Sequence, residues 1–331
     1  MQDDGVMRLA LVAVAAVFAA FFGLAVLAGA AVQIVAGGTE GISTDARTLW
    51  WVPLVAQATA GTAVPQPLEL GLIATESGGN YTATDDDANG TVDAGLAQIN
   101  SGPQPADPHW AALGLSGNPY APAANVAASV RVLAADLAAN GSLSAALYAY
   151  NGGTPSNGLQ YDPAYAPKIL AAADALDAGP HVYAWPVGSQ VTKGTLGFIG
   201  GGLWEAAPLA GTSPGTTWVL VTAAAPTGAP HSLGSHTWRP LLPPSTVTAT
   251  VDGQAVVAQP STAAPKGLAG LTPPDSAYWW FPVPLSTAET TAAVTATWTE
   301  TTPPPTGCSG CQPTKQTITD STTIHIREQE G

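Results

Sequence analysis

Apolar side chains recur at helical spacing through the region from residue 46 to 178. The clearest stripe consists of apolar residues three or four positions apart that end at a helix stop: Val126, Val130, Leu133, Leu137 and then Asn140-Gly141. The same spacing predicts helices from Leu143 to Tyr150, with Ser142 as the expected cap, and from Tyr165 to Leu176. The pattern therefore predicts a mainly helical domain over residues 46–178.

An earlier helix carries a carboxyl group on its apolar face. It begins near Pro65 and ends at Ser77-Gly78-Gly79, and Leu68, Leu72 and Glu76 lie four residues apart on one side. A carboxyl group held against apolar neighbours loses hydration of its charged form, so its pKa rises and it can stay protonated near neutrality. Glu76 is therefore a candidate general acid, and the alternative is a helix-terminal glutamate that faces solvent.

The second half of the chain alternates apolar and polar residues with a period of two. Asp252-Gly253 separates two such runs, which predicts a hairpin, and Val294, Ala296 and Trp298 alternate with threonines. We expect residues 181–331 to form a separate all-β, sandwich-like domain. Together with the helical region and a small hairpin within it, the predicted fold class is α+β.

The chain begins with a long apolar run. Every residue from Leu9 to Val32 is Ala, Val, Leu, Phe or Gly, which is about 36 Å of helix against a hydrocarbon core of about 30 Å. This predicts a transmembrane helix over residues 9–35 and a cytoplasmic tail over residues 1–8, with Arg8 favouring a cytoplasmic N-terminus. The rest of the chain would then lie outside the cytoplasm, and it would be secreted if the apolar segment were cleaved.

Charge and cysteine content narrow the function classes. Nine basic residues against 23 acidic residues give a net charge of -14, so no basic surface could neutralise a phosphate backbone, and nucleic-acid binding is excluded. Cys308 and Cys311 lack the four ligands of a structural zinc site and are expected to form a small disulfide. We expect no metal and no cofactor.

A second carboxylate is expected opposite Glu76. Asn89-Gly90 predicts a tight hairpin whose returning strand carries Asp93, and this hairpin can fold Asp93 back across the end of the Glu76 helix. Two carboxyl groups that face each other across a cleft are what glycosidic cleavage requires, since one protonates the leaving oxygen and the other assists at the anomeric carbon.

The segments ESGGN at 76–80, NGTVDAGLAQINS at 89–101 and AYNGG at 149–153, together with Tyr165, resemble the lysozyme-like superfamily. Specifically, they are similar to bacterial lytic transglycosylases of the soluble and secretion-associated types, over about residues 50–176. The interval from Glu76 to Asp93 and the block that follows it are also similar to c-type animal lysozymes.

The resemblance implies a role for each matching position. Glu76 would act as general acid and then base on peptidoglycan, with the sugar's own 6-hydroxyl as the attacking oxygen, so that an anhydro-muramyl end forms. The other matching residues would shape the groove: Ser77 supports the end of the Glu76 helix, Gln98 and Asn100 fix the cleft wall, and Tyr150, Asn151 and Tyr165 bind the glycan. Buried hydrogen bonding is the alternative for Gln98 and Asn100, and core packing for Tyr150. The family usually has Met where Ala97 stands, so one wall of the cleft is smaller here.

Two other reactions or roles stay open. With Asp93 as a second carboxylate, water could complete the reaction and the enzyme would be a muramidase of the lysozyme type. A non-catalytic scaffold that binds the cell wall is the other alternative. The expected partners are peptidoglycan glycan strands, a bacterial cell membrane and, by family analogy, an envelope-spanning secretion or conjugation complex.

Three further patterns are assigned ordinary structural roles and not functional sites. The acidic residues Asp85, Asp87 and Asp93 imitate the start of a calcium loop, but Leu96 stands where a bidentate glutamate is expected, so a solvated hairpin is the adopted interpretation. His231 and His236 lack a third ligand. Trp279, Trp280 and Phe281 are expected to pack in a core.

Overall fold

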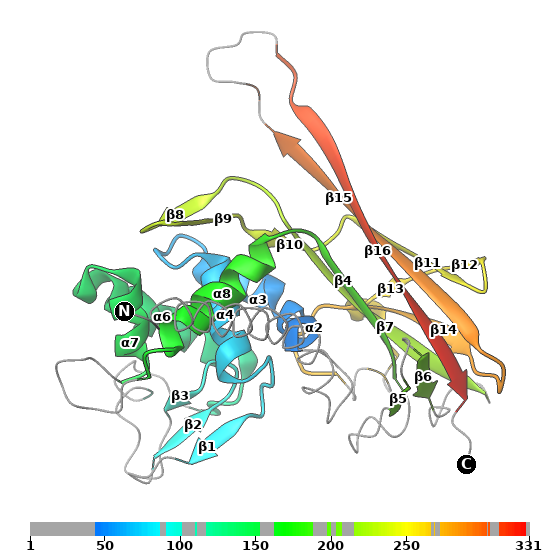
Figure 1. The fold of residues 1–331 in the computed structure, drawn as a ribbon, viewed down its shortest axis with the longest axis horizontal. Coiled ribbons are helices and arrows are strands. Elements are labelled where there is room, and N and C mark those ends of the chain that lie inside the picture. Colours follow the sequence, from blue (N-terminus) through cyan, green and yellow to red (C-terminus); the bar gives the residue numbers. More distant parts are fainter. Residues whose placement is uncertain are drawn as a thin grey trace, which may run out of the picture.

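The computed structural model has an α+β fold in which helices come first along the chain and strands follow (Figure 1). It describes residues 44–86, 91–100, 110, 117–152, 162–187, 197–199, 203–206, 215–265, 268, 272–302, 304 and 311–328. The predicted transmembrane run, Leu9 to Val32, lies outside these residues. Within the described part of the chain, no helix combines the length and the apolar character needed to cross a bilayer.

The helical region closely follows the sequence pattern. Its helices are α2 (Thr44–Leu49), α3 (Val52–Thr59), α4 (Gln66–Glu76), α6 (Pro122–Asn140), α7 (Leu143–Tyr150) and α8 (Tyr165–Asp177). The predicted stop after Asn140 is confirmed, because Gly141 has the left-handed φ of 66° that ends α6. The predicted cap of α7 is also confirmed, since the Ser142 side chain accepts a hydrogen bond of 3.3 Å from the Ala145 amide.

Helices α4 and α8 pack unusually closely because Gly71 has no side chain. A Cβ atom at this position would lie 2.7 Å from the Ile169 carbonyl oxygen and 2.9 Å from the Ala173 nitrogen. The backbone of α8 therefore occupies the space where any other residue would place its side chain. This contact sets the separation of the two helices that carry Glu76 and Tyr165.

A small antiparallel sheet lies beside the helices, as the Asn-Gly signal predicted. Its strands, in spatial order, are β1 (Thr84–Asp86), β2 (Val92–Ala94) and β3 (Ile99–Asn100). Asp93 on β2 pairs with Asp85 on β1 and with Asn100 on β3. The turn at Asn89-Gly90 itself, and Asp87, lie outside the described residues.

The rest of the described chain is a β-sandwich. One sheet contains β4 (His181–Val187), β7 (Thr216–Pro226), β10 (Leu241–Leu242), β13 (Gln259–Pro260) and β14 (Trp279–Pro284). The facing sheet contains β5 (Gly197–Ile199), β6 (Leu203–Ala206), β11 (Thr246–Val251), β12 (Gln254–Val256), β15 (Thr290–Thr302) and β16 (Thr314–Glu328). A short hairpin joins β8 (His231–Leu233) to β9 (His236–Trp238).

The predicted details of the sandwich largely hold. Asp252 and Gly253 both have positive φ, 47° and 77°, and connect β11 to β12 in the expected hairpin. Phe281 is fully buried in the core between the two sheets, as predicted from the sequence. Cys311 is disulfide-bonded, while Cys308 lies outside the described residues.

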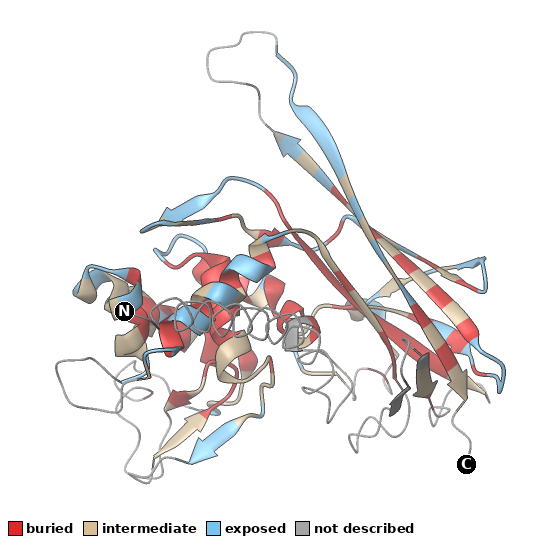
Figure 2. Cartoon of the chain, viewed as in Figure 1, coloured by how far each residue is buried: buried red, intermediate tan, exposed pale blue. Residues whose placement is uncertain are grey.

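Beyond the rest of their sheet, β15 and β16 continue as a long exposed ribbon (Figures 1 and 2).

Strand β7 belongs to two hydrophobic cores at once. Successive side chains of a strand point to opposite faces. Val219, Val221 and Ala223 therefore pack into the sandwich core, while Trp218 and Leu220 pack against the helices. Figure 2 shows β7 buried along almost its whole length. This explains why its sequence, TTWVLVTAAAP, is apolar without alternation.

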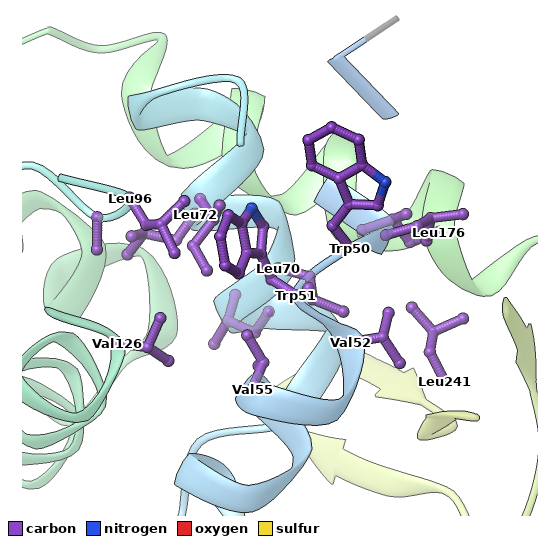
Figure 3. Packing of buried hydrophobic residues seen from close by; sticks show 14 of the residues in the cluster. Trp50, Trp51, Val52, Val55, Leu70, Leu72, Leu96, Val126, Leu176 and Leu241 are labelled. Atoms are coloured by element: carbon purple, nitrogen blue, oxygen red, sulfur yellow. The ribbon is translucent and has the colours of Figure 1, made fainter. Parts of the chain in front are cut away.

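The predicted order of a helical region followed by a β-rich region is confirmed, and direct contacts join the β-sandwich to the helices. The buried side chain of Gln66, the first residue of α4, donates to the carbonyls of Val52 (2.9 Å) and Leu241 (3.1 Å) and accepts from the Leu241 amide (2.7 Å). Figure 3 shows Leu241 packed near Val52 in the same cluster as Leu70 and Leu72 of α4. The sequence could not reveal this, because each periodic segment is compatible with packing on either partner.

Candidate active site

Glu76 is the last residue of α4 and contacts the first residue of α8. Its carboxyl accepts a short hydrogen bond from the Tyr165 hydroxyl, and the ring of Tyr165 is buried beside it. The glutamate is itself half-buried rather than turned into bulk water. The structure thus brings together two residues, 89 positions apart, that the sequence pattern had singled out.

The surroundings of Glu76 favour its protonated form. Loss of hydration is the main cause that raises its pKa from 4.5 to about 7, and the negative charge of Asp93 raises it further. The hydrogen bond from Tyr165 acts in the opposite direction, because it stabilises the carboxylate. A pKa of about 7 lets the group both give and take a proton near neutrality.

Asp93 reaches the site through the small sheet. Antiparallel pairing of β1 with β2 returns the chain toward the end of α4, and the charge of Asp93 acts on Glu76. The structure thus brings the two predicted carboxyl groups into one electrostatic unit. The participation of Asp93 in a reaction stays a prediction.

The end of α4 is tied to the segment that follows Asp93. The Ser77 hydroxyl donates a hydrogen bond of 2.7 Å to the Leu96 carbonyl, with the Ile73 carbonyl at 3.2 Å. Gly95 turns with a φ of 80°, and a Cβ atom there would lie 2.6 Å from Asn125 Nδ2. Ser77 therefore holds the 95–98 segment against the helix that ends in Glu76, as its predicted supporting role requires.

Gln98 and Asn100 make hydrogen bonds within the protein. Gln98 has a positive φ of 48°, and its side-chain amide donates to the carbonyls of Gly95 (2.7 Å) and Ala83 (3.2 Å). The Asn100 amide donates to the Thr91 hydroxyl at 2.6 Å. These contacts are consistent with the predicted structural role of Gln98 and Asn100 beside the site. Direct contact of either residue with a glycan stays a prediction.

Tyr150 and Asn151 have different surroundings. The Tyr150 hydroxyl lies 2.8 Å from the Ala97 carbonyl and 3.1 Å from the Ser129 hydroxyl, and its pKa is raised well above its ordinary value, chiefly by burial. Tyr150 therefore supports the backbone at Ala97 from the protein interior. Asn151 is exposed at the end of α7.

Two buried polar residues escaped the sequence analysis. Asn125 on α6 accepts from the Ala97 amide and donates to the carbonyls of Ala94 and Pro119, so it organises the backbone beside Asp93. Glu69 on α4 is fully buried. The signal for each was a polar residue within an otherwise apolar stretch of its helix.

The arrangement can perform acid–base chemistry. Glu76 can exchange a proton near neutral pH, and Asp93 adds a second negative charge. In the described ranges, no three His, Cys, Asp or Glu side chains gather in a way that could hold a metal ion. His236 instead lies 3.3 Å from the Asp174 carboxylate.

Comparison with known proteins gives one family match. Residues 53–169 match the family described as the transglycosylase SLT domain, and this range includes all the residues of the site described above. No curated protein matches the chain significantly.

Proposed function

We propose that this protein cleaves the β-1,4 bond between MurNAc and GlcNAc in peptidoglycan as a lytic transglycosylase, because residues 53–169 match the transglycosylase SLT domain of the lysozyme-like superfamily. The observation that carries the proposal is the Glu76 carboxyl, which is poorly hydrated, bonded to Tyr165 and held at a pKa of about 7. A family match alone would not supply an acid in the correct protonation state.

In the proposed reaction Glu76 first donates its proton to the oxygen of the glycosidic bond. The resulting carboxylate is stabilised by the hydrogen bond from Tyr165. It then accepts the proton of the sugar's 6-hydroxyl as that oxygen attacks the anomeric carbon, so the 1,6-anhydro ring closes and Glu76 is protonated again. No water enters the product.

The second candidate is a muramidase. It is favoured by one observation, the charge of Asp93 acting on Glu76, because a nearby carboxylate could assist at the anomeric carbon while water completes the reaction. The two candidates share the acid and differ in the acceptor and in the role of Asp93. A scaffold without activity is the third outcome of the same test.

The test is digestion of purified peptidoglycan by the full chain, with the released fragments identified by mass spectrometry. We expect anhydro-muramyl ends, and we expect Glu76→Gln to lower the rate by about 10²- to 10⁴-fold, since it removes general acid–base catalysis. Glu300→Gln is the matched control, because Glu300 lies on β15 and accepts from the Gly228 amide, outside the site.

Each alternative has its own result. Reducing ends would show the muramidase. Equal release by the wild type and Glu76→Gln would rule out Glu76 as the acid, and no release by either would favour the scaffold.

We also infer a location outside the cytoplasm, with the chain held at a bacterial membrane by the helix predicted at residues 9–35. The support is the apolar run itself together with a substrate that lies outside the cell. On this proposal residues 1–8 are cytoplasmic, residues 46–178 act on the wall, and the β-sandwich faces the wall or an envelope-spanning complex.

A further inference from the structure

Glu69 is a buried carboxyl group for which the proposed reaction has no role. It lies on α4 seven residues before Glu76, which is two helical turns and about 10 Å along the axis, on nearly the same face. Its side chain is fully buried, and neither carboxyl oxygen makes a hydrogen bond of good geometry, although the Ser129 hydroxyl is close enough to affect its pKa. Leucines at 68, 70 and 72 surround it in the sequence, so an apolar residue would fit the helix pattern better.

A series of polar groups leads from Glu69 to the wall of the site. The Ser129 hydroxyl of α6 interacts with the Glu69 side chain and also lies 3.1 Å from the Tyr150 hydroxyl. Tyr150 in turn donates to the Ala97 carbonyl at 2.8 Å, and the adjacent Leu96 carbonyl accepts from Ser77, the residue after Glu76. Glu69 and the C-terminal end of α4 are thus connected through Ser129, Tyr150 and the 96–97 backbone.

The groups that interact with Glu69 lie on its own helix and on α6, α7 and α8, and none of these groups is basic. They are Glu76 on its own helix, Ser129 on α6, Tyr150 on α7 and Tyr165 on α8, with Asp93 acting on Glu76 and Tyr150 from β2. A carboxylate at position 69 would have no positive neighbour among them. Burial outweighs the Ser129 interaction, which favours the charged form, so the neutral acid is the favoured state at this position.

We propose that Glu69 is a positioning residue that acts, as a neutral carboxylic acid, through Ser129 and Tyr150 on the wall of the site and through its charge state on Glu76. The proposal rests on the function proposed above, since it assigns Glu69 to the same site. A core filler would have neither effect.

The mutual repulsion of the two carboxylates fits the proposal. Burial raises the pKa of Glu69 to about 8, and the charge of Glu76 also acts to raise it. A negative Glu76 therefore disfavours a second charge beside it, so on this proposal Glu69 stays neutral while Glu76 gives and takes its proton. Above pH 8 the second ionisation adds a buried charge beside the acid, so the rate should fall with the square of the hydroxide concentration rather than in proportion to it.

The experiment compares the full-length wild type with Glu69→Gln and Glu69→Leu on peptidoglycan from pH 6 to 9.5. Glutamine keeps the shape and polarity of the neutral acid but cannot ionise. We expect it to lower kcat at pH 6 by about threefold or less, and to be about tenfold faster than the wild type at pH 9, one unit above the pKa of Glu69. Leucine lacks the polar contact and should lower kcat at pH 6 by about tenfold or more.

A second readout does not depend on activity. At pH 7.5 the infrared band of protonated carboxyl groups should be weaker in Glu69→Gln than in the wild type, because the variant has lost a buried neutral acid. If Glu69→Leu does not fold, Ser129→Ala replaces it: this variant should lower kcat yet keep the steep fall of the rate above pH 8.

The results distinguish a failure of the role proposed for Glu69 from a failure of the proposed function. An infrared band that is unchanged in Glu69→Gln, or rate profiles that coincide in all variants, would overturn the role of Glu69. A wild type that releases no glycan while the infrared difference persists would count against the proposed function instead, and with it against any effect of Glu69 on that reaction.

Discussion

At the scale of single residues, the site depends on how two opposing influences on Glu76 balance. Burial and the charge of Asp93 raise its pKa, and the hydrogen bond from Tyr165 lowers it, with a net value of about 7. Neither influence is a property of the glutamate itself. The chemistry of residue 76 is thus set by side chains that are 17 and 89 positions away along the chain.

Removing the Tyr165 hydroxyl should move the pH profile in a defined direction. Tyr165→Phe loses a hydrogen bond to the charged form of Glu76, so the pKa of Glu76 should rise, and activity that needs the protonated acid should persist to a pH about one unit higher. The measurement is the rate of peptidoglycan cleavage from pH 5 to 9. Tyr148→Phe is the control, because the Tyr148 hydroxyl donates to the Pro163 carbonyl at the surface. A shift to lower pH, or equal shifts in both variants, would contradict this account.

At the scale of elements, the close packing of α4 against α8 decides whether Glu76 and Tyr165 can meet. Gly71 lies about a turn and a half before Glu76 and faces the backbone of α8 near Ile169 and Ala173. Glycine costs helix stability relative to alanine, by about 1 kcal/mol. That cost is offset here because only glycine admits the neighbouring helix at this distance.

Gly71→Ala should therefore separate the helices despite the better helix propensity of alanine. The added Cβ would lie 2.7 Å from a backbone oxygen, and we expect a loss of about 1–3 kcal/mol in the free energy of unfolding. The alkaline limb of the activity profile should move in the same direction as in Tyr165→Phe. Urea unfolding and the pH profile measure the two effects. Gly179→Ala serves as the control, since a Cβ at Gly179 meets no atom within 4 Å, and a cost equal to that of Gly71→Ala would refute the packing argument.

At the scale of the whole molecule, the helices and the β-sandwich form one packed body. Gln66, Val52 and Leu241 join them at the start of α4, and β7 presents one face to each core. The strand region therefore supports the helix that carries Glu76 as well as filling its own core. Attachment of this body to a membrane through residues 9–35 is a proposal.

Membrane attachment can be tested in the full chain. We expect the wild type to stay with membranes after alkaline extraction. The pair Val17→Asp and Leu24→Asp should release it, because each aspartate near the centre of a spanning helix costs about 2.5–3.5 kcal/mol of insertion free energy. Val17→Leu with Leu24→Val keeps the run apolar and should stay attached. Wild-type protein that is soluble and shortened would instead show that the segment is cleaved.

The sequence by itself determined several helix and turn positions, the choice of Glu76 as the candidate acid and the family resemblance. These features depend on local chemistry: the stop at Gly141, the cap at Ser142 and the Asp252-Gly253 turn are each decided by a few neighbouring residues. The apolar stripe that ends at Glu76 likewise indicated a poorly hydrated carboxyl group.

Only the tertiary structure decided which elements share a core and which polar groups meet. Periodicity tells which face of an element is buried but not what buries it, so the contact between Gln66 and Leu241 and the two-sided burial of β7 could not be predicted from spacing. The pKa of Glu76 belongs to the same class, because desolvation and charge act through space between residues that the fold brings together.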